Sequence, residues 1–289
     1  MPIVYACIAP HGGEAIPQLA SKSTLQKFKA TRQGLRKLAD EIANTKPDTV
    51  VIATPHNIRL RRCIGIVTAE NSSGRLQASR KRKASVSLKV KCDQEFAEKL
   101  LSLATRKKLP VAGANYGTSE GAASDMPMDW GTLVPLWFIM KRSRRKPKVV
   151  IVTPSREIPL KQNYEFGRAI GELAEKRSKR YVFVASADQA HAHKKSGPYG
   201  FSKAAAVYDR LVLDAIRSNR INGIMNFKTK LVEDAKPDSL WQMTMLAGVL
   251  SKVRLYPELF SYQVPTYYGM ICAGFRRTNK GHNSTRFQV

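Results

Sequence analysis

The sequence is short of cysteine, of histidine and of long apolar stretches. Its four cysteines are widely spaced without a CxxC pair, and most lie in apolar strand-like runs, where a free thiol behaves as a small hydrophobe. No apolar run approaches the ~20 residues needed to cross a bilayer, and the start, MPIVYACIAP, lacks a basic region followed by a long apolar segment. We therefore expect a soluble cytoplasmic protein in a reducing compartment, without a membrane partner.

Acidic residues are scarce relative to basic ones. The chain has 22 Asp plus Glu against 49 Lys plus Arg, a net charge of +27, and such an excess attracts polyanions. The basic residues form many clusters, among them "RLRR" at 59–62 and "KRSRRKPK" at 141–148, and none is interleaved with aromatic residues as a base-stacking platform would be. A solvated basic surface is the favoured interpretation. Nucleic acid or an anionic substrate is the alternative.

Hydrophobic residues make up 43% of the 289 residues, enough for a sizeable core. Apolar runs rich in β-branched and aromatic residues alternate with longer segments of helical spacing, which predicts one α/β domain over residues 1–289, with a mostly parallel or mixed sheet and helices on both faces. The expected strands are 3–9, 49–54, 63–69, 149–153, 181–186 and 266–273. The expected helical segments are 21–44, 93–105, 132–142, 161–178, 202–218 and 238–251.

Two segments do not fit this alternation. Residues 70–92 are polar and basic, which predicts a hairpin or a sheet edge. Residues 111–131, rich in Gly, Ala, Ser, Asp and Met, lack clear periodicity, and a loop of that length in a compact domain is usually functional or mobile.

Histidines follow the predicted strands. Of five in the chain, four come just after short apolar runs, at His11, His56, His191 and His193. Ligands of open α/β sheets bind beyond the carboxyl ends of the strands, so polar residues there are the first candidates for a site. Two imidazoles and one carboxylate would form the facial triad that holds non-haem Fe(II). Asp188 of "FVASADQAHAH" and Asp129 of "SDMPMDWGTLVPL" lie at similar positions.

Each of these residues also has a structural explanation. A single histidine after a strand is more often a hydrogen-bonded structural residue than a ligand, and Asp188 could cap a turn. Asp238, before a predicted helix, could be an N-cap, a metal ligand or neither.

Five segments in order resemble a known family. "APHGG", "TPHN", "MDWGTLVPL", "SADQAHAH…GPYGF" and "PTYYGM" are similar to segments of the class III extradiol ring-cleavage dioxygenases, of the type represented by the catalytic chain of protocatechuate 4,5-dioxygenase. The resemblance covers nearly the whole chain and extends to the broader superfamily that includes Memo-like proteins, in which a similar site has no established ring-cleaving activity.

The resemblance implies a metal site and an acid/base residue. His11 and His56 would be the histidine ligands and Asp238 the carboxylate ligand, with Glu233 and Asp234 as competitors. His191 and Asp188 match the histidine and the acid of the family's "GDLSH" pattern, so His191 would be the catalytic acid/base and Asp188 would orient the loop or an imidazole.

The sequence departs from the family at two positions. Trp130 stands where ring-cleaving members carry the histidine of "DHG", and Asp238 stands where they usually carry glutamate. His193 would either replace the missing imidazole as a catalytic residue or be a solvated loop residue. We expect Trp130, Asp129 and Tyr199 to contact the substrate.

The function implied is an oxidoreductase, an Fe(II)-dependent extradiol dioxygenase acting on a small aromatic diol and O₂. Zinc or another divalent metal is the alternative cofactor, and a Memo-like metal-binding protein without ring cleavage is the alternative function. Related catalytic chains form homo-oligomers or pair with a small second subunit. Lys194 and Lys195, beside the expected site, suggest an acidic aromatic substrate, although two lysines in such a turn are more often simply solvated.

Overall fold

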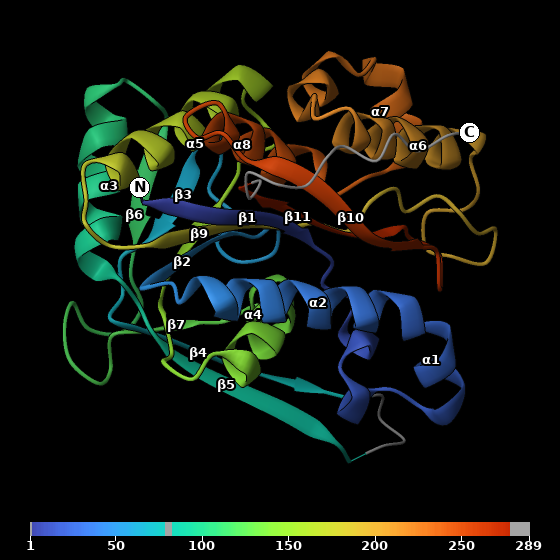
Figure 1. The fold of residues 1–289 in the computed structure, drawn as a ribbon, viewed down its shortest axis with the longest axis horizontal. Coiled ribbons are helices and arrows are strands. Elements are labelled where there is room, and N and C mark those ends of the chain that lie inside the picture. The colour runs from blue at the N-terminus through green and yellow to red at the C-terminus, as the bar shows by residue number, and fades with distance from the viewer. Residues whose placement is uncertain (1, 79–82, 278–289) are drawn as a thin grey trace.

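A mixed eight-stranded β-sheet forms the centre of the computed structural model, which describes residues 2–78 and 83–277 (Figure 1). The strand order is β10-β11-β1-β9-β2-β8-β3-β6. The adjacent strands β1, β9, β2 and β8 run parallel, whereas β11 joins β1, and β3 joins β8, antiparallel. The predicted α/β class with a mixed sheet is therefore confirmed. The strands span Ile3–Ala9 (β1), Thr49–Ala53 (β2), Ile64–Val67 (β3), Val111–Ala114 (β6), Lys148–Thr153 (β8), Tyr181–Ser186 (β9), Tyr256–Gln263 (β10) and Met270–Arg276 (β11).

Helices cover both faces of this sheet, as the sequence predicts. Strand β9 shows why: Phe183 and Ala185 point into one core cluster, while Val182 and Val184 point into the other. The first face packs against α3 (Gln94–Arg106), α5 (Leu160–Glu175), α6 (Lys203–Arg217) and α8 (Leu240–Leu250), and the second against α2 (Lys29–Thr45) and α4 (Trp130–Arg142).

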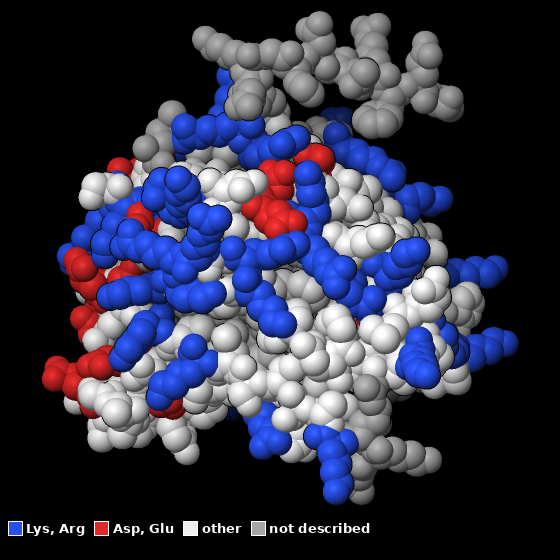
Figure 2. Space-filling model, turned by 60° about the horizontal axis from the view of Figure 1, so that its bottom comes forward, with Lys and Arg blue, Asp and Glu red and all other residues white. Residues whose placement is uncertain are grey.

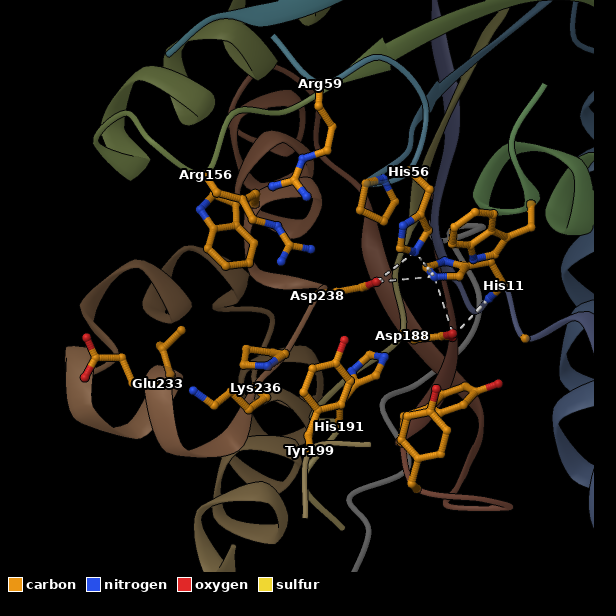
Figure 3. Close-up of a pocket in the computed structure, with 18 of the residues that line it drawn as sticks. His11, His56, Arg59, Arg156, Asp188, His191, Tyr199, Glu233, Lys236 and Asp238 are labelled. Carbon is orange, nitrogen blue, oxygen red and sulfur yellow. Dashed lines mark hydrogen bonds and ion pairs between the residues drawn. The ribbon is translucent and has the colours of Figure 1, made fainter. Parts of the chain in front are cut away.

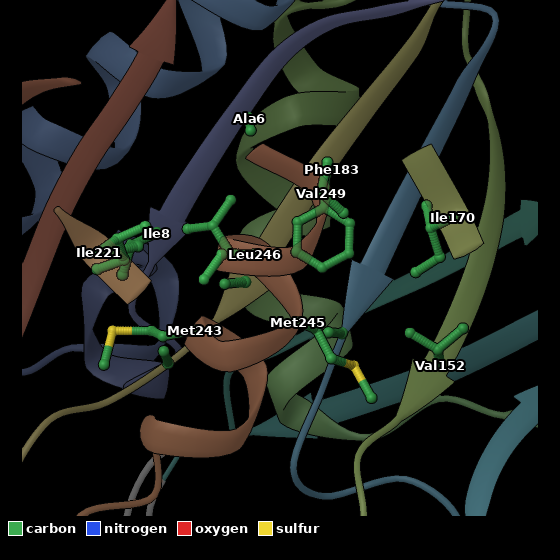
Figure 4. Packing of buried hydrophobic residues seen from close by; sticks show 14 of the residues in the cluster. Ala6, Ile8, Val152, Ile170, Phe183, Ile221, Met243, Met245, Leu246 and Val249 are labelled. Carbon is green, nitrogen blue, oxygen red and sulfur yellow. The ribbon is translucent and has the colours of Figure 1, made fainter. Parts of the chain in front are cut away.

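Helix α8 is buried on nearly all sides. Met243, Met245 and Leu246 lie in the first core cluster with Ile8 of β1 and Phe183 of β9 (Figure 4). A helix that is apolar around its whole circumference belongs in a core. This burial fixes the position of the residues that directly precede α8, which matters for the site.

The structure differs from the expected elements in several places. The helical segment 21–44 is interrupted at the fully buried Phe28, which separates α1 (Lys22–Lys27) from α2. Residues 111–131 are more ordered than expected, since they contain β6, β7 (Asp125–Pro127) and the start of α4. The expected strand 266–273 begins only at Met270. Strand β10 and helix α7 (Thr229–Ala235) were not predicted.

The polar segment 70–92 is a hairpin, as predicted. Strands β4 (Asn71–Gln77) and β5 (Ser85–Lys91) pair antiparallel and form a second sheet with β7. Residues 79–82 of the hairpin lie outside the described part of the chain. Val86, Val90 and Met126 are buried in the second core cluster, so this sheet is not wholly outside the core.

Basic side chains dominate one face of the molecule. Figure 2 shows Lys and Arg spread across much of this face, with few acidic side chains among them. Within residues 2–78 and 83–277, no helix combines the length and the apolar character needed to cross a membrane.

Candidate metal centre

The candidate site lies at the carboxyl edge of the four central parallel strands. His11 follows β1, His56 follows β2, Arg156 follows β8, and both Asp188 and His191 follow β9. Because these strands are adjacent and parallel, the segments that follow them meet in one place. There they line a cavity of about 920 Å³.

Two histidines and one carboxylate converge in this cavity (Figure 3). His11 Nε2 lies 3.1 Å from His56 Nε2, and Asp238 Oδ2 lies 3.0 Å from His56 Nε2 and 3.5 Å from His11 Nε2. Ligands bound at about 2.1 Å to one ion lie roughly 3.0–3.5 Å apart. The second carboxylate oxygen, Asp238 Oδ1, is buried and has no hydrogen-bond partner among the described residues. The geometry and the unpartnered oxygen both fit a divalent cation, and two imidazoles with one carboxylate are the donor set of a facial triad.

Asp238 is held by the backbone at the start of α8. Its side chain caps no helix, since the N-cap residue of α8 is Ser239 and makes no side-chain cap. Gln242 Nε2 donates to the carbonyls of Asp238 (2.7 Å) and Ser186 (3.1 Å), which ties this helix start to the end of β9. The competing acids lie outside the triad: Asp234 pairs with Lys230 at 3.2 Å, and Glu233 is exposed.

The His11 ring is oriented by hydrogen bonds behind it. Ser186 Oγ donates to the Gly131 carbonyl at 2.5 Å and lies 3.0 Å from His11 Nδ1. Because the Ser186 hydroxyl donates its only proton to the Gly131 carbonyl, it can only accept a hydrogen bond from His11 Nδ1–H. In the neutral imidazole, Nε2 then carries the lone pair, and it faces His56 and Asp238. The backbone N–H of His11 donates to Asp188 Oδ1 at 3.0 Å. This hydrogen bond ties the loop that carries His11 to Asp188, and the orienting role expected for Asp188 stays a prediction.

Burial and neighbouring charges shift the pKa values of His11, Asp188 and Asp238. Burial alone would lower the pKa of His11, but Asp188 and Asp238 outweigh it and raise that pKa to about 9. Burial raises the pKa of Asp188 to about 6, although His11 opposes it. For Asp238, the contacts with His11 and His56 outweigh burial and lower its pKa. The metal-free cluster thus holds a proton at neutral pH where a cation would sit.

Trp130 lines the cavity beside His56. The two rings stack with centroids 4.1 Å apart and an interplanar angle of 26°, and Trp130 is 46% exposed. Asp129, expected to contact substrate, does not line this cavity. It is the N-cap of α4, accepting from Thr132 N–H at 2.9 Å and from Thr54 Oγ1 at 2.7 Å, so it fixes the position of Trp130.

His191 lines the opposite wall of the cavity. Its Nδ1 lies 2.8 Å from the Gln189 carbonyl, which can only accept, so Nδ1 carries the proton and Nε2 is left free. The ring stacks on Tyr268 at 5.1 Å and meets the edge of Tyr199 at 5.6 Å. Tyr199 also lines the cavity, and its contact with a substrate stays a prediction.

His193 does not reach the cavity, contrary to the expected catalytic role. Its Nε2 lies 2.9 Å from Asp209 Oδ2 of α6, a fully buried carboxylate that also accepts from Tyr262 Oη and from the backbone N–H of Ala190. His193 is thus neither a replacement imidazole nor a solvated loop residue, because it belongs to a buried network beneath the His191 loop. Asp209 was too far along the chain for the sequence to indicate this pairing.

Sequence reasoning missed much of the cavity wall. Arg156 follows β8 as His56 follows β2, and that position was the signal that could have found it. The missed lining residues include Arg59, Arg156, Lys236, Trp241, Tyr267 and Tyr268. Lys194 and Lys195 are exposed and are not among the lining residues, so they do not supply the positive charge of the site.

Known proteins share this architecture. The crystal structure of the uncharacterized protein JW3007 from Escherichia coli K12 superimposes with a TM-score of 0.58 and 14% identity, covering 94% of this chain and 99% of that one, which shows a common fold. Protein CA_C1420 of Clostridium acetobutylicum is 25% identical over 256 residues, 89% of this chain and 54% of that protein, so the chain spans about half the length of this relative. Residues 5–274 match the family described as the catalytic LigB subunit of aromatic ring-opening dioxygenase, and the chain belongs to that family.

Proposed function

We propose that this chain is a non-haem Fe(II)-dependent extradiol dioxygenase that opens the ring of a catechol-type diol. The observation that carries the proposal is the triad of His11, His56 and Asp238, with the unpartnered Asp238 Oδ1, in a cavity that also contains His191. Bound Fe(II) would supply a redox-active Lewis acid for the diol and O₂. Family membership supports the same class of reaction.

The protein side chains orient the substrate and move its protons. The Nε2 atom of His191, left free by the hydrogen bond at Nδ1, accepts a proton from a diol hydroxyl and returns it to the ring-opened product. Tyr267, Tyr268 and Trp130 line the cavity around the triad and hold an aromatic ring between them. Both atoms of O₂ enter the product, so no further oxidant or reductant is required.

The direct test is anaerobic loading with Fe(II), followed by oxygen uptake and absorbance measurements on a panel of catechols. We expect oxygen uptake with the appearance of a yellow ring-opened product. His191→Asn should lower turnover while Fe(II) binding persists, because His191 is not in the triad. Absence of oxygen uptake with every diol by the Fe(II)-loaded protein would reject the proposal.

A second candidate is a Memo-like metal-binding protein without ring cleavage. The stacking of Trp130 on His56 favours it, because this indole stands where ring-cleaving relatives carry an imidazole. The aspartate at 238 favours it as well. Metal analysis after mild purification separates the two: firmly bound zinc or copper without oxygen uptake supports this candidate, whereas labile ferrous iron supports the dioxygenase.

A further inference from the structure

The cavity extends well beyond the triad. Its volume of about 920 Å³ is near the upper end of the roughly 300–1,000 Å³ of small-molecule sites, and is far more than one aromatic ring fills. In Figure 3, Arg59 and Arg156 reach into it on the side of Asp238 away from His11. Lys236, which directly follows α7, also lines the cavity. The far part of the cavity is therefore lined by three cationic side chains.

These three cations have no anionic partner. No ion pair or hydrogen bond of the side chains of Arg59, Arg156 or Lys236 occurs within residues 2–78 and 83–277. Arg156 instead stacks over the Trp241 ring at 4.5 Å. The carboxylate of Asp238 is engaged by His11 and His56. Glu233 lines the same cavity, and Glu157 lines a neighbouring pocket together with Arg59 and Arg156. Among the described residues, neither acid forms an ion pair with these cations; Glu157 instead accepts from the backbone N–H of Arg62.

The two guanidinium groups also act on each other. Burial of the Arg156 guanidinium among its neighbours lowers its pKa; the carboxylate of Asp238 opposes this effect, and the charge of Arg59 adds to it. Like charges held close together repel each other, so a ligand anion in contact with both guanidinium groups would relieve their repulsion. Guanidinium forks bind carboxylate and phosphate oxygens through paired hydrogen bonds, and the stacking of Arg156 on Trp241 holds its fork in a fixed orientation.

We propose that Arg59, Arg156 and Lys236 form a subsite for an oxyanion, a carboxylate or a phosphate, carried by the aromatic substrate while its ring lies at the triad. The assignment rests on the proposed function, because that function places the aromatic ring of the substrate at the triad. It names the substrate as an anionic aromatic compound and assigns its specificity to three residues outside the metal site.

The test is calorimetric titration of the Zn(II)-loaded full chain with phenyl phosphate, benzoate, phenol and inorganic phosphate. We expect phenyl phosphate or benzoate to bind at least about tenfold more tightly than phenol, and more tightly than inorganic phosphate, since ring and anion contacts add. The comparison of phenyl phosphate with benzoate identifies the preferred oxyanion. Equal affinity for phenol, or for inorganic phosphate, overturns the proposal.

Variants locate the subsite. Arg59→Gln and Arg156→Gln should each weaken the binding of the anionic ring at least about fivefold, while Arg156→Lys, which keeps the charge, should weaken it less. The matched control is Lys194→Gln, an exposed lysine outside the cavity, which should leave affinity within about twofold. If Arg156→Gln unfolds, the affinity of the Arg59→Gln variant, at an exposed position, decides the outcome.

The binding readout is independent of catalysis. Anion binding that depends on Arg59 in a protein without oxygen uptake supports the subsite and rejects the dioxygenase. Ring opening by a protein whose affinity for the charged and uncharged rings is equal supports the dioxygenase and overturns the subsite.

Discussion

His11 is the residue in which structure and chemistry are most tightly joined. Its Nδ1 donates to Ser186, its backbone N–H donates to Asp188, and its Nε2 faces Asp238 and His56. Asp188 and Asp238 therefore do two things at once: they aim the imidazole, and they favour its protonated form in the metal-free protein. A cation bound in the proposed triad would replace that proton, so protons and metal would compete for Nε2.

Metal affinity should rise with pH because of this competition. The pKa of His11 is raised to about 9, so below that value the ring must lose a proton before it binds, and the Zn(II) association constant should increase up to about tenfold per pH unit between pH 6 and 8.5. Calorimetry in buffers of different ionisation enthalpy should count roughly one proton released per ion at pH 7.

Asp188→Asn provides the comparison for this prediction. It removes the charge that does most to raise the pKa of His11, so the steep part of the pH dependence should move to lower pH. A wild-type affinity that does not change with pH would show that His11 is already neutral, and would contradict the titration argued for the cluster.

At the scale of elements, a buried network holds the loop that carries His191. Asp209 of α6 accepts from the Ala190 backbone, from His193 and from Tyr262 of β10. The loop after β9, helix α6 and the more distant strand β10 thus meet at one carboxylate with no solvent exposure. The structural role of His193 follows from this arrangement.

Asp209→Asn should disturb this loop without touching the metal. The amide NH₂ of the asparagine would face the His193 and Tyr262 donors that now bind the carboxylate, so we expect the free energy of unfolding to fall by roughly 2 kcal/mol. We also expect slower ring opening, because His191 would be misplaced. Metal affinity should stay unchanged, since Asp209 contacts no triad residue. Asp214→Asn, an exposed position on the same helix, is the control. If Asp209→Asn and Asp214→Asn changed stability and turnover equally, Asp209 would have no special role in positioning His191.

Close packing of α5 on α8 sets the position of Asp238. A Cβ added at Gly248 would collide with the Tyr164 carbonyl oxygen and lie 2.9 Å from the Arg168 backbone nitrogen, so the helices would have to separate. We expect Gly248→Ala to lower the free energy of unfolding by roughly 1–3 kcal/mol in urea denaturation, despite the better helix propensity of alanine. Gly223→Ala, where no atom lies within 4 Å of the added carbon, should be nearly neutral. Similar losses of unfolding free energy in Gly248→Ala and Gly223→Ala would argue against close packing of α8 on α5 at Gly248.

At the scale of the molecule, the sequence predicts the central sheet and its helices better than it predicts the residues that line the cavity. Strands β1, β2, β8 and β9 are buried on both faces and read as short apolar runs, whereas β10 is an edge strand of mixed polarity, YPELFSYQ, with only partial burial. His11 and His56 were visible because each follows a strand and a proline. Arg156 has the same position after a strand, but it is not a residue type of a facial triad, so it was passed over. The pairing of His193 with Asp209 depends on how α6 packs against the loop after β9, which no local pattern encodes.

The candidate metal site joins segments that are distant in the sequence. His11 follows β1, His56 follows β2, and Asp238 precedes α8. Binding to the folded state alone should therefore stabilise the whole domain, and free Zn(II) at about 100 times its Kd should raise Tm by roughly 5 °C or more. Differential scanning calorimetry with and without metal measures this. Asp238→Asn should lose the shift, whereas Glu233→Gln, a cavity acid outside the triad, should keep it. A shift of full size in Asp238→Asn would mean that the ion binds elsewhere.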